Sequence, residues 1–122
     1  MERVQEFSQD GKIFVSIDFS GLSADEDFFK VIELAVPMIA KHPEKSVYTI
    51  TNIDNLRFDT HTKEIAVNFM EQNKPYVKCG VITGLDGIKK MMARTVMMKS
   101  GRTNMYFTFS EEQAIEWLLR QE

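Results

Sequence analysis

The 122-residue sequence predicts an α/β fold, in which a mostly parallel sheet with an antiparallel N-terminal strand is flanked by helices. Segments whose apolar residues alternate, as in strands, take turns along the chain with segments whose apolar residues recur every three to four positions, as in helices. Near the N-terminus, a turn signal separates two strand-like segments with no helix between them. The expected order is β-β-α-β-α-β-α-β-α, and strands that alternate with helices are typical of parallel sheets with right-handed crossovers.

The first three expected elements are a hairpin and a helix. Residues 4–7 and 13–19 alternate as strands do, and the turn between them contains Asp10 and Gly11. Residues 23–26 (SADE) have the pattern of a capping box, and the amphipathic helix that follows is expected to end near His42.

The rest of the chain repeats a strand-helix unit three times. β-branched residues in alternation predict the strands, and Asp, Ser, Gly and Pro residues mark the helix ends. The expected elements are a strand over 46–53, a helix from Asp59 or Thr60 to 73, a strand over 76–83, a helix over 85–100, a strand over 105–109 and a helix after Ser110. Together with the hairpin they predict a single domain over residues 1–122.

Composition and charge exclude several classes of function. Lys and Arg number 15 against 18 Asp and Glu, a formal charge of -3, so we expect no attraction to nucleic acid. Cys79 is the single cysteine, which fits a reducing, cytoplasmic setting, and no apolar stretch is long enough for a membrane span. His42 and His61 have no partner at metal-ligand spacing, so neither a metal nor a cofactor is expected.

Asp59, Thr60, His61 and Thr62 are the densest polar group on a strand-to-helix loop, and they are the candidate binding or regulatory loop. Ligands of open α/β sheets bind at the carboxyl ends of strands, where this loop is expected. His61 is a candidate base or phosphoacceptor, or else an exposed histidine in a capping loop. Cys79 is a candidate nucleophile beside it, or else a buried structural thiol. An enzyme using Asp59, His61 and Cys79 is therefore the third of three interpretations.

Gly84 and Gly87 lie in a turn that is a candidate anion site. The turn precedes the helix over 85–100, whose early residues include Lys89 and Lys90, and free amides at a helix N-terminus attract anions. The turn lacks the Gly-Lys-Ser/Thr ending of a phosphate loop, and Asp86 would repel a phosphate. A simple strand-helix connection is the alternative interpretation.

Methionine is unevenly distributed, since five of the eight methionines fall within residues 91–105. On a helical wheel Met92 joins the apolar core stripe of Leu85, Ile88 and Val96, whereas Met91 and Met98 lie about 100° from it and Met97 is displaced to the other side. Flexible methionines suit adaptable contacts with a partner or an apolar ligand, and ordinary helix packing is the alternative. The residues of this possible interface, including the basic ones that would meet an acidic partner, are Met91, Met97, Met98, Arg94 and Arg102.

Several segments together resemble a known family. Residues 50–62 (ITNIDNLRFDTHT) stand where STAS domains have an Asp-Ser-Ser-Gly-like loop between a strand and a helix. Residues 74–78 (KPYVK), 81–90 (VITGLDGIKK), 100–102 (SGR) and 111–118 (EEQAIEWL) are similar to the small stand-alone bacterial SpoIIAA-like proteins. That group is related by fold to STAS domains and to CRAL-TRIO lipid-binding domains. The resemblance covers about residues 10 to 120.

The resemblance implies a non-enzymatic regulatory or protein-interaction domain that binds a protein partner or a second copy of itself. The alternative that it implies is a carrier of a small apolar or lipid-like ligand. STAS antagonists are switched by phosphorylation of a serine, and this sequence departs from them because His61 stands at that position. Phosphorylation of Thr60 or Thr62 at the helix start is one interpretation, and plain helix capping is the other.

Overall fold

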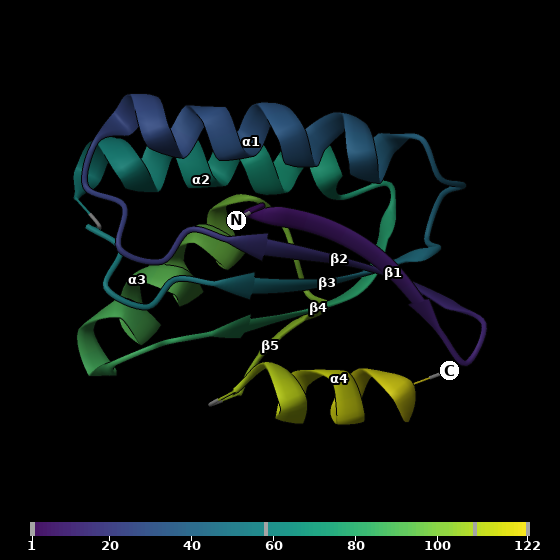
Figure 1. Cartoon of the computed structure of the whole chain (residues 1–122). Coiled ribbons are helices and arrows are strands. Elements are labelled where there is room, and N and C mark those ends of the chain that lie inside the picture. The colour runs from purple at the N-terminus through teal and green to yellow at the C-terminus, as the bar shows by residue number, and fades with distance from the viewer. Residues whose placement is uncertain (1, 58, 109, 122) are drawn as a thin grey trace.

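The computed structural model describes residues 2–57, 59–108 and 110–121 and confirms the α/β fold and the order of its elements. The elements are β1 (Val4–Gln9), β2 (Lys12–Asp18), α1 (Asp25–Ala40), β3 (Val47–Asn52), α2 (Thr60–Asn73), β4 (Val77–Thr83), α3 (Gly87–Lys99), β5 (Met105–Phe107) and α4 (Glu111–Leu119). The strands form a five-stranded sheet in the order β1-β2-β3-β4-β5 (Figure 1). β1 pairs antiparallel with β2, and the other neighbours are parallel.

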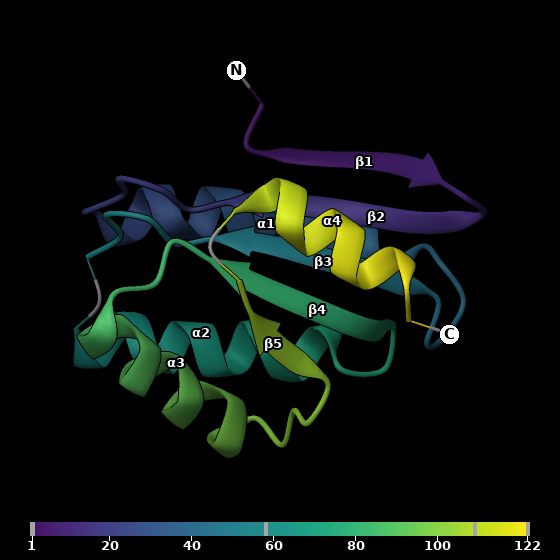
Figure 2. The ribbon, with the colours of Figure 1, turned by 90° about the horizontal axis from the view of Figure 1, so that it is seen from below.

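Three helices cover one face of the sheet, and α4 alone covers the other (Figures 1 and 2). From β2 to β5 each new strand is added on the same side of the previous one. Because crossovers between parallel strands share one hand, three crossovers in one direction put α1, α2 and α3 on the same face. The opposite face depends on nine-residue α4, which packs on β3 and β4 and leaves part of that face uncovered.

The strands divide their buried side chains between two clusters, as alternation requires. The larger cluster lies under α1, α2 and α3, and Phe19 packs edge-on against Phe28 and Phe69 there. The smaller cluster lies under α4, where Leu118 is fully buried near Phe14. Both faces of β4 therefore carry buried side chains over most of the strand, which explains its nearly unbroken apolar sequence.

The sequence prediction of secondary structure is wrong at some ends of helices and strands. Ser23 does not cap α1: the N-cap is Ala24, which makes no side-chain cap hydrogen bond, so the predicted capping box is wrong. By contrast, Asp59 and Ser110 cap α2 and α4 as predicted. The last strand is shorter than the predicted 105–109, and Phe109 lies outside the described residues.

Candidate functional site

The loop after β3 brings together the residues Asp59 to Thr62. Oδ1 of Asp59 accepts hydrogen bonds from the amide of Thr62 at 2.9 Å and from its hydroxyl at 3.0 Å. These bonds, the amide first, lower the pKa of the Asp59 carboxyl because they stabilise its charged form. Thr62 is buried with its hydroxyl in this cap, whereas Thr60 is exposed. Of the two threonines considered for phosphorylation, Thr60 is thus the accessible one.

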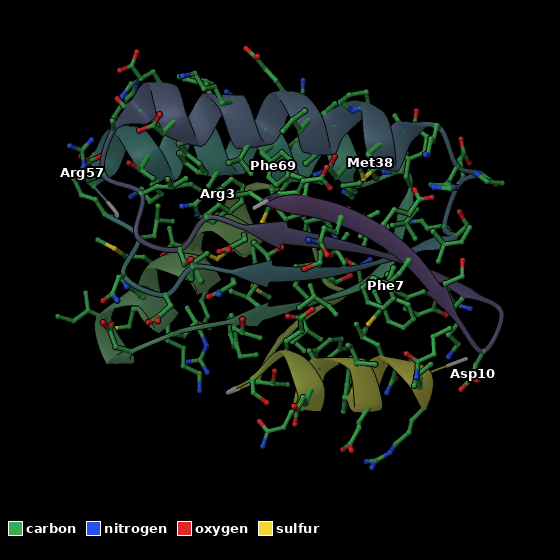
Figure 3. All side chains as sticks on the ribbon, viewed as in Figure 1. Arg3, Phe7, Asp10, Met38, Arg57 and Phe69 are labelled. Carbon is green, nitrogen blue, oxygen red and sulfur yellow. The ribbon has the colours of Figure 1, made fainter. Side chains whose placement is uncertain are left out.

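His61 is held by a carboxylate far from it in the sequence. Its Nδ1 lies 2.6 Å from Oδ2 of Asp25, in the first turn of α1, and Oδ1 of Asp25 accepts a 3.2 Å hydrogen bond from Nη2 of Arg57. Nε of Arg57 lies 3.3 Å from Oδ2 of Asp59. Figure 3 shows Arg57 at the end of the molecule where α1 and α2 begin. The cluster therefore ties the starts of two helices together.

The structure does not bring Cys79 and His61 together. Cys79 packs in the cluster under α4, whereas His61 extends from α2 on the other face of the sheet. Burial is the main cause that raises the pKa of the Cys79 thiol, which keeps it protonated at neutral pH. The pair of nucleophile and base that the enzyme interpretation needs is absent at these positions.

The glycine turn before α3 carries two acidic side chains, Asp54 and Asp86, as well as the basic Lys89. Oδ1 of Asp86 accepts the amide of Lys89 at 2.9 Å and so caps the helix that an anion would otherwise approach. Asp54 and Asp86 both line the shallow pocket beside Gly84. A Cβ at Gly84 would stand 2.5 Å from the backbone nitrogen of Asp54, so close packing accounts for this glycine. These contacts support the simple-turn interpretation.

A polar groove of about 440 Å³ opens on the sheet face that α4 leaves uncovered. Its lining includes Asp18, Asn52 and Thr83 at the carboxyl ends of three parallel strands, and Glu111 at the start of α4. Sequence reasoning missed it, because its residues come from five elements and share no local motif. Arg3, the cation in its lining, is already engaged by the carbonyl oxygen of Ser20 at 2.8 Å.

The outer face of α3 is a stripe of exposed apolar residues, Ile88, Met91 and Met98, which we call the α3 stripe. Their side chains are 73%, 70% and 75% exposed. Just two of the thirteen residues of α3, Ala93 and Val96, are buried. The helical wheel therefore predicted the directions of Met91 and Met98 correctly, but its placement of Ile88 in the core stripe is wrong, because Ile88 opens the helix on its outer face.

Two residues of the predicted interface lie elsewhere. Met97 is half-buried and packs against the larger core cluster. Arg102 is 5% exposed, so it cannot add charge to a surface. The expectation that Arg102 belongs to an interface is wrong, because the chain turns inward after α3. Gly101 adopts φ +72° there, and the amide of Arg102 donates to the carbonyl of Met97 at 2.9 Å, which ends the helix in a Schellman motif.

Arg102 lies instead in the lining of an apolar cavity of about 60 Å³ between the sheet and the helices. Its Nε donates to Oδ1 of Asn104 at 2.9 Å, Nη1 to the carbonyl of Met70 at 3.2 Å, and Nη2 to Sδ of Met105 at 3.0 Å. Burial without a carboxylate partner lowers the pKa of Arg102 to about 10, so the guanidinium is still charged at neutral pH.

Two buried polar side chains, Thr49 of β3 and Asn73 of α2, also line this cavity. Sequence reasoning missed both. Asn73 offered a signal, because it falls four residues after Phe69 on the apolar face of α2. Figure 3 shows Phe69 between α2 and the sheet, on the side where the cavity lies.

No protein-family model and no curated protein matches this chain. Within residues 2–57, 59–108 and 110–121, no helix is long and apolar enough to cross a membrane. In the same ranges, no three His, Cys, Asp or Glu side chains are grouped so that they could hold a metal ion. The geometry described above gives four candidate sites: the α3 stripe, the loop cluster around Asp25 and His61, the polar groove and the cavity at Arg102.

Proposed function

We propose that this protein is a non-enzymatic, cytoplasmic interaction domain of the STAS type that binds an acidic and apolar surface of a partner protein through α3. The α3 stripe of Ile88, Met91 and Met98 carries the proposal. Single exposed apolar residues are common on proteins, but three on one helix face form a patch of the kind that marks interaction sites. Methionine adds adaptability, because its side chain is flexible and polarizable.

The charge around the stripe favours an acidic partner. α3 contains four of the 15 Lys and Arg residues and none of the 18 Asp and Glu residues of the chain. At 100° per residue, Lys90 and Arg94 fall on one side of the stripe and Lys99 on the other. A symmetric dimer that packed α3 against its own copy would bring like charges together, whereas an acidic surface would complement them.

The resemblance to STAS and SpoIIAA-like proteins supports the same class of function. STAS domains include anti-sigma-factor antagonists, which act by binding other proteins. The loop that carries the switch serine in that family is here joined to α1 through Asp25 and His61, whereas the exposed apolar side chains of α3 make no such contact.

Peptide-display selection against the immobilised full chain tests the proposal. We expect the selected peptides to be rich in Asp, Glu and apolar residues, and to bind the double variant Met91→Ser/Met98→Ser at least tenfold more weakly, or about 1.4 kcal/mol. Arg94→Ser should weaken the same peptides and reduce the salt dependence of their binding. Leu34→Ser is the matched control, because Leu34 is an exposed apolar residue on α1.

Three outcomes would contradict the proposal. Selected peptides that bind the double variant as well as the original chain would place the surface elsewhere. A dimeric mass in light scattering that the double variant reduces to 14.1 kDa would make a second copy the occupant. Co-sedimentation with vesicles containing phosphatidylserine, lost in the double variant, would make an anionic membrane the occupant.

A further inference from the structure

We infer that the cavity between the sheet and helices α2 and α3 binds a short-chain monocarboxylate, whose carboxylate pairs with Arg102 and whose alkyl chain fills the apolar space. This site is separate from the outer face of α3, and the inference does not depend on the proposed interaction function. Three observations carry it: an uncompensated buried charge, two buried polar side chains in an otherwise apolar lining, and the size of the cavity.

The first observation is the charge of Arg102. A guanidinium has five N–H donors, and buried guanidinium groups are ordinarily paired with a carboxylate or phosphate. The three acceptors around Arg102, on Asn104, Met70 and Met105, are all uncharged, and the thioether sulfur is a weak one. No carboxylate in the described parts of the chain lies within ion-pair distance of Arg102. An anion in the cavity would supply the missing charge.

The second observation is the state of Thr49 and Asn73. Each is 4% exposed, and each places a polar side chain in the lining of a cavity that is otherwise mostly apolar. Oγ1 of Thr49 and Sδ of Met105 each lie 2.5 Å from the point where a Cβ on Gly80 would stand. Since Nη2 of Arg102 contacts that same sulfur at 3.0 Å, Thr49 and Arg102 approach one region of the cavity. We place the carboxylate in this region, with Arg102 as its charged donor and Thr49 as its neutral one.

The third observation is size. One water needs ~10–15 Å³ by the measure that gives this cavity about 60 Å³, so the space holds roughly four to six non-hydrogen atoms. Propionate and butanoate have that size, whereas the chain of a membrane lipid is far larger. Inorganic phosphate fits poorly, because Ile17, Ile82, Val96 and other apolar side chains make up most of the lining.

Small side chains explain why the space exists. Ala66 of α2 and Ala93 of α3 line the cavity from the helix side. Across from them, β3 contributes Thr49 and Thr51, whose side chains are smaller than those of the apolar residues around them. The void therefore follows from the sequence at positions where larger apolar residues would pack.

Titration of the full-length ¹⁵N-labelled protein with sodium butanoate, followed by amide chemical shifts, tests the inference. We expect saturable shifts at Thr49, Asn73 and Val96. Arg102→Met should weaken binding at least tenfold, and Arg120→Met, which removes the same charge from an exposed position, should leave it unchanged. Butanamide has nearly the same shape without the charge, and we expect it to bind at least tenfold more weakly.

Each result of this titration either supports the carboxylate site or overturns it. Equal binding of butanamide and butanoate would overturn the pairing with Arg102, and this comparison decides the question even if Arg102→Met does not fold. Shifts that phosphate reproduces, or that spread over surface amides without saturation, would show a general salt effect and overturn the site. Thr49→Val keeps the shape of the side chain, so unchanged binding in that variant would remove Thr49 from the site, whereas weaker binding would support the geometry.

Discussion

Replacing Gly84 by alanine should destabilise the protein by about 3 kcal/mol. Gly84 has φ +82°, a left-handed conformation that costs an alanine ~1–2 kcal/mol. The new Cβ would also stand 2.5 Å from the backbone nitrogen of Asp54. That contact forces the neighbouring loop to move, which weakens the 3.0 Å hydrogen bond from the amide of Ile53 to the carbonyl of Thr83. A buried backbone group left without its partner costs ~1–3 kcal/mol.

Substitutions at two other glycines separate the cost of backbone strain from the cost of the close Cβ contact. Gly21 has φ +71° but nothing within 4 Å of its ideal Cβ, so Gly21→Ala should cost ~1 kcal/mol from backbone strain alone. Gly87 opens α3 with free space around it, so Gly87→Ala should be neutral or stabilise by up to ~1 kcal/mol. Urea unfolding measures the free energy of unfolding of all three variants, and unchanged m-values would show that the differences are differences in stability. A Gly84→Ala cost no larger than that of Gly21→Ala would refute the close-packing explanation.

Three further predictions concern the candidate site residues. Asp59 has a lowered pKa in the folded state, so its contribution to the free energy of unfolding is present above pH 3.8 and is lost as the pH falls through the folded-state pKa. Asp59→Asn keeps a cap acceptor and should lose less stability on acidification, as measured by urea unfolding across pH. Thr62→Glu should destabilise α2 because Thr62 is buried, whereas Thr60→Glu should be tolerated or add ~0.3–1 kcal/mol; equal thermal shifts would contradict this. Cys79 should react with Ellman's reagent only as fast as the protein opens, and reaction at the rate of a free thiol would show that it is not buried.

The order of elements could be predicted because periodicity and helix stops are local signals. The alternation of residues 46–53 and the helix stop at Gly101 each depend on neighbours within a few positions, and both appear in the structure. Ser23 shows the limit of such signals. Its sequence fits a capping box, but α1 begins one residue later than that pattern requires, with Ala24 as the N-cap. Helix ends commonly shift by one or two residues, so a capping pattern alone does not fix the first residue of a helix.

The candidate sites were predictable in part where one helix contains the signal, although the wheel wrongly placed Ile88 in the core. A helical wheel is enough to place Met91 and Met98 outside, because their directions depend on α3 alone. The partners of His61 and Arg102 were not predictable in this way. Asp25 reaches His61 across 36 positions of sequence, and Arg102 reaches the carbonyl of Met70 across 32. Charge alone placed Arg102 on a surface, whereas the turn after α3 buries it.

α3 connects the two proposed sites, because its outer face is the α3 stripe and its end holds Arg102. The Schellman motif fixes the backbone of Arg102 to the last turn of the helix through the carbonyl of Met97. With Ala93 and Val96 as its buried residues, α3 has few apolar contacts to hold it against the sheet. A carboxylate bound to Arg102 would therefore stabilise the packing of α3 against the sheet. By linkage, any partner that prefers α3 in this packed position would bind the carboxylate-loaded protein more tightly.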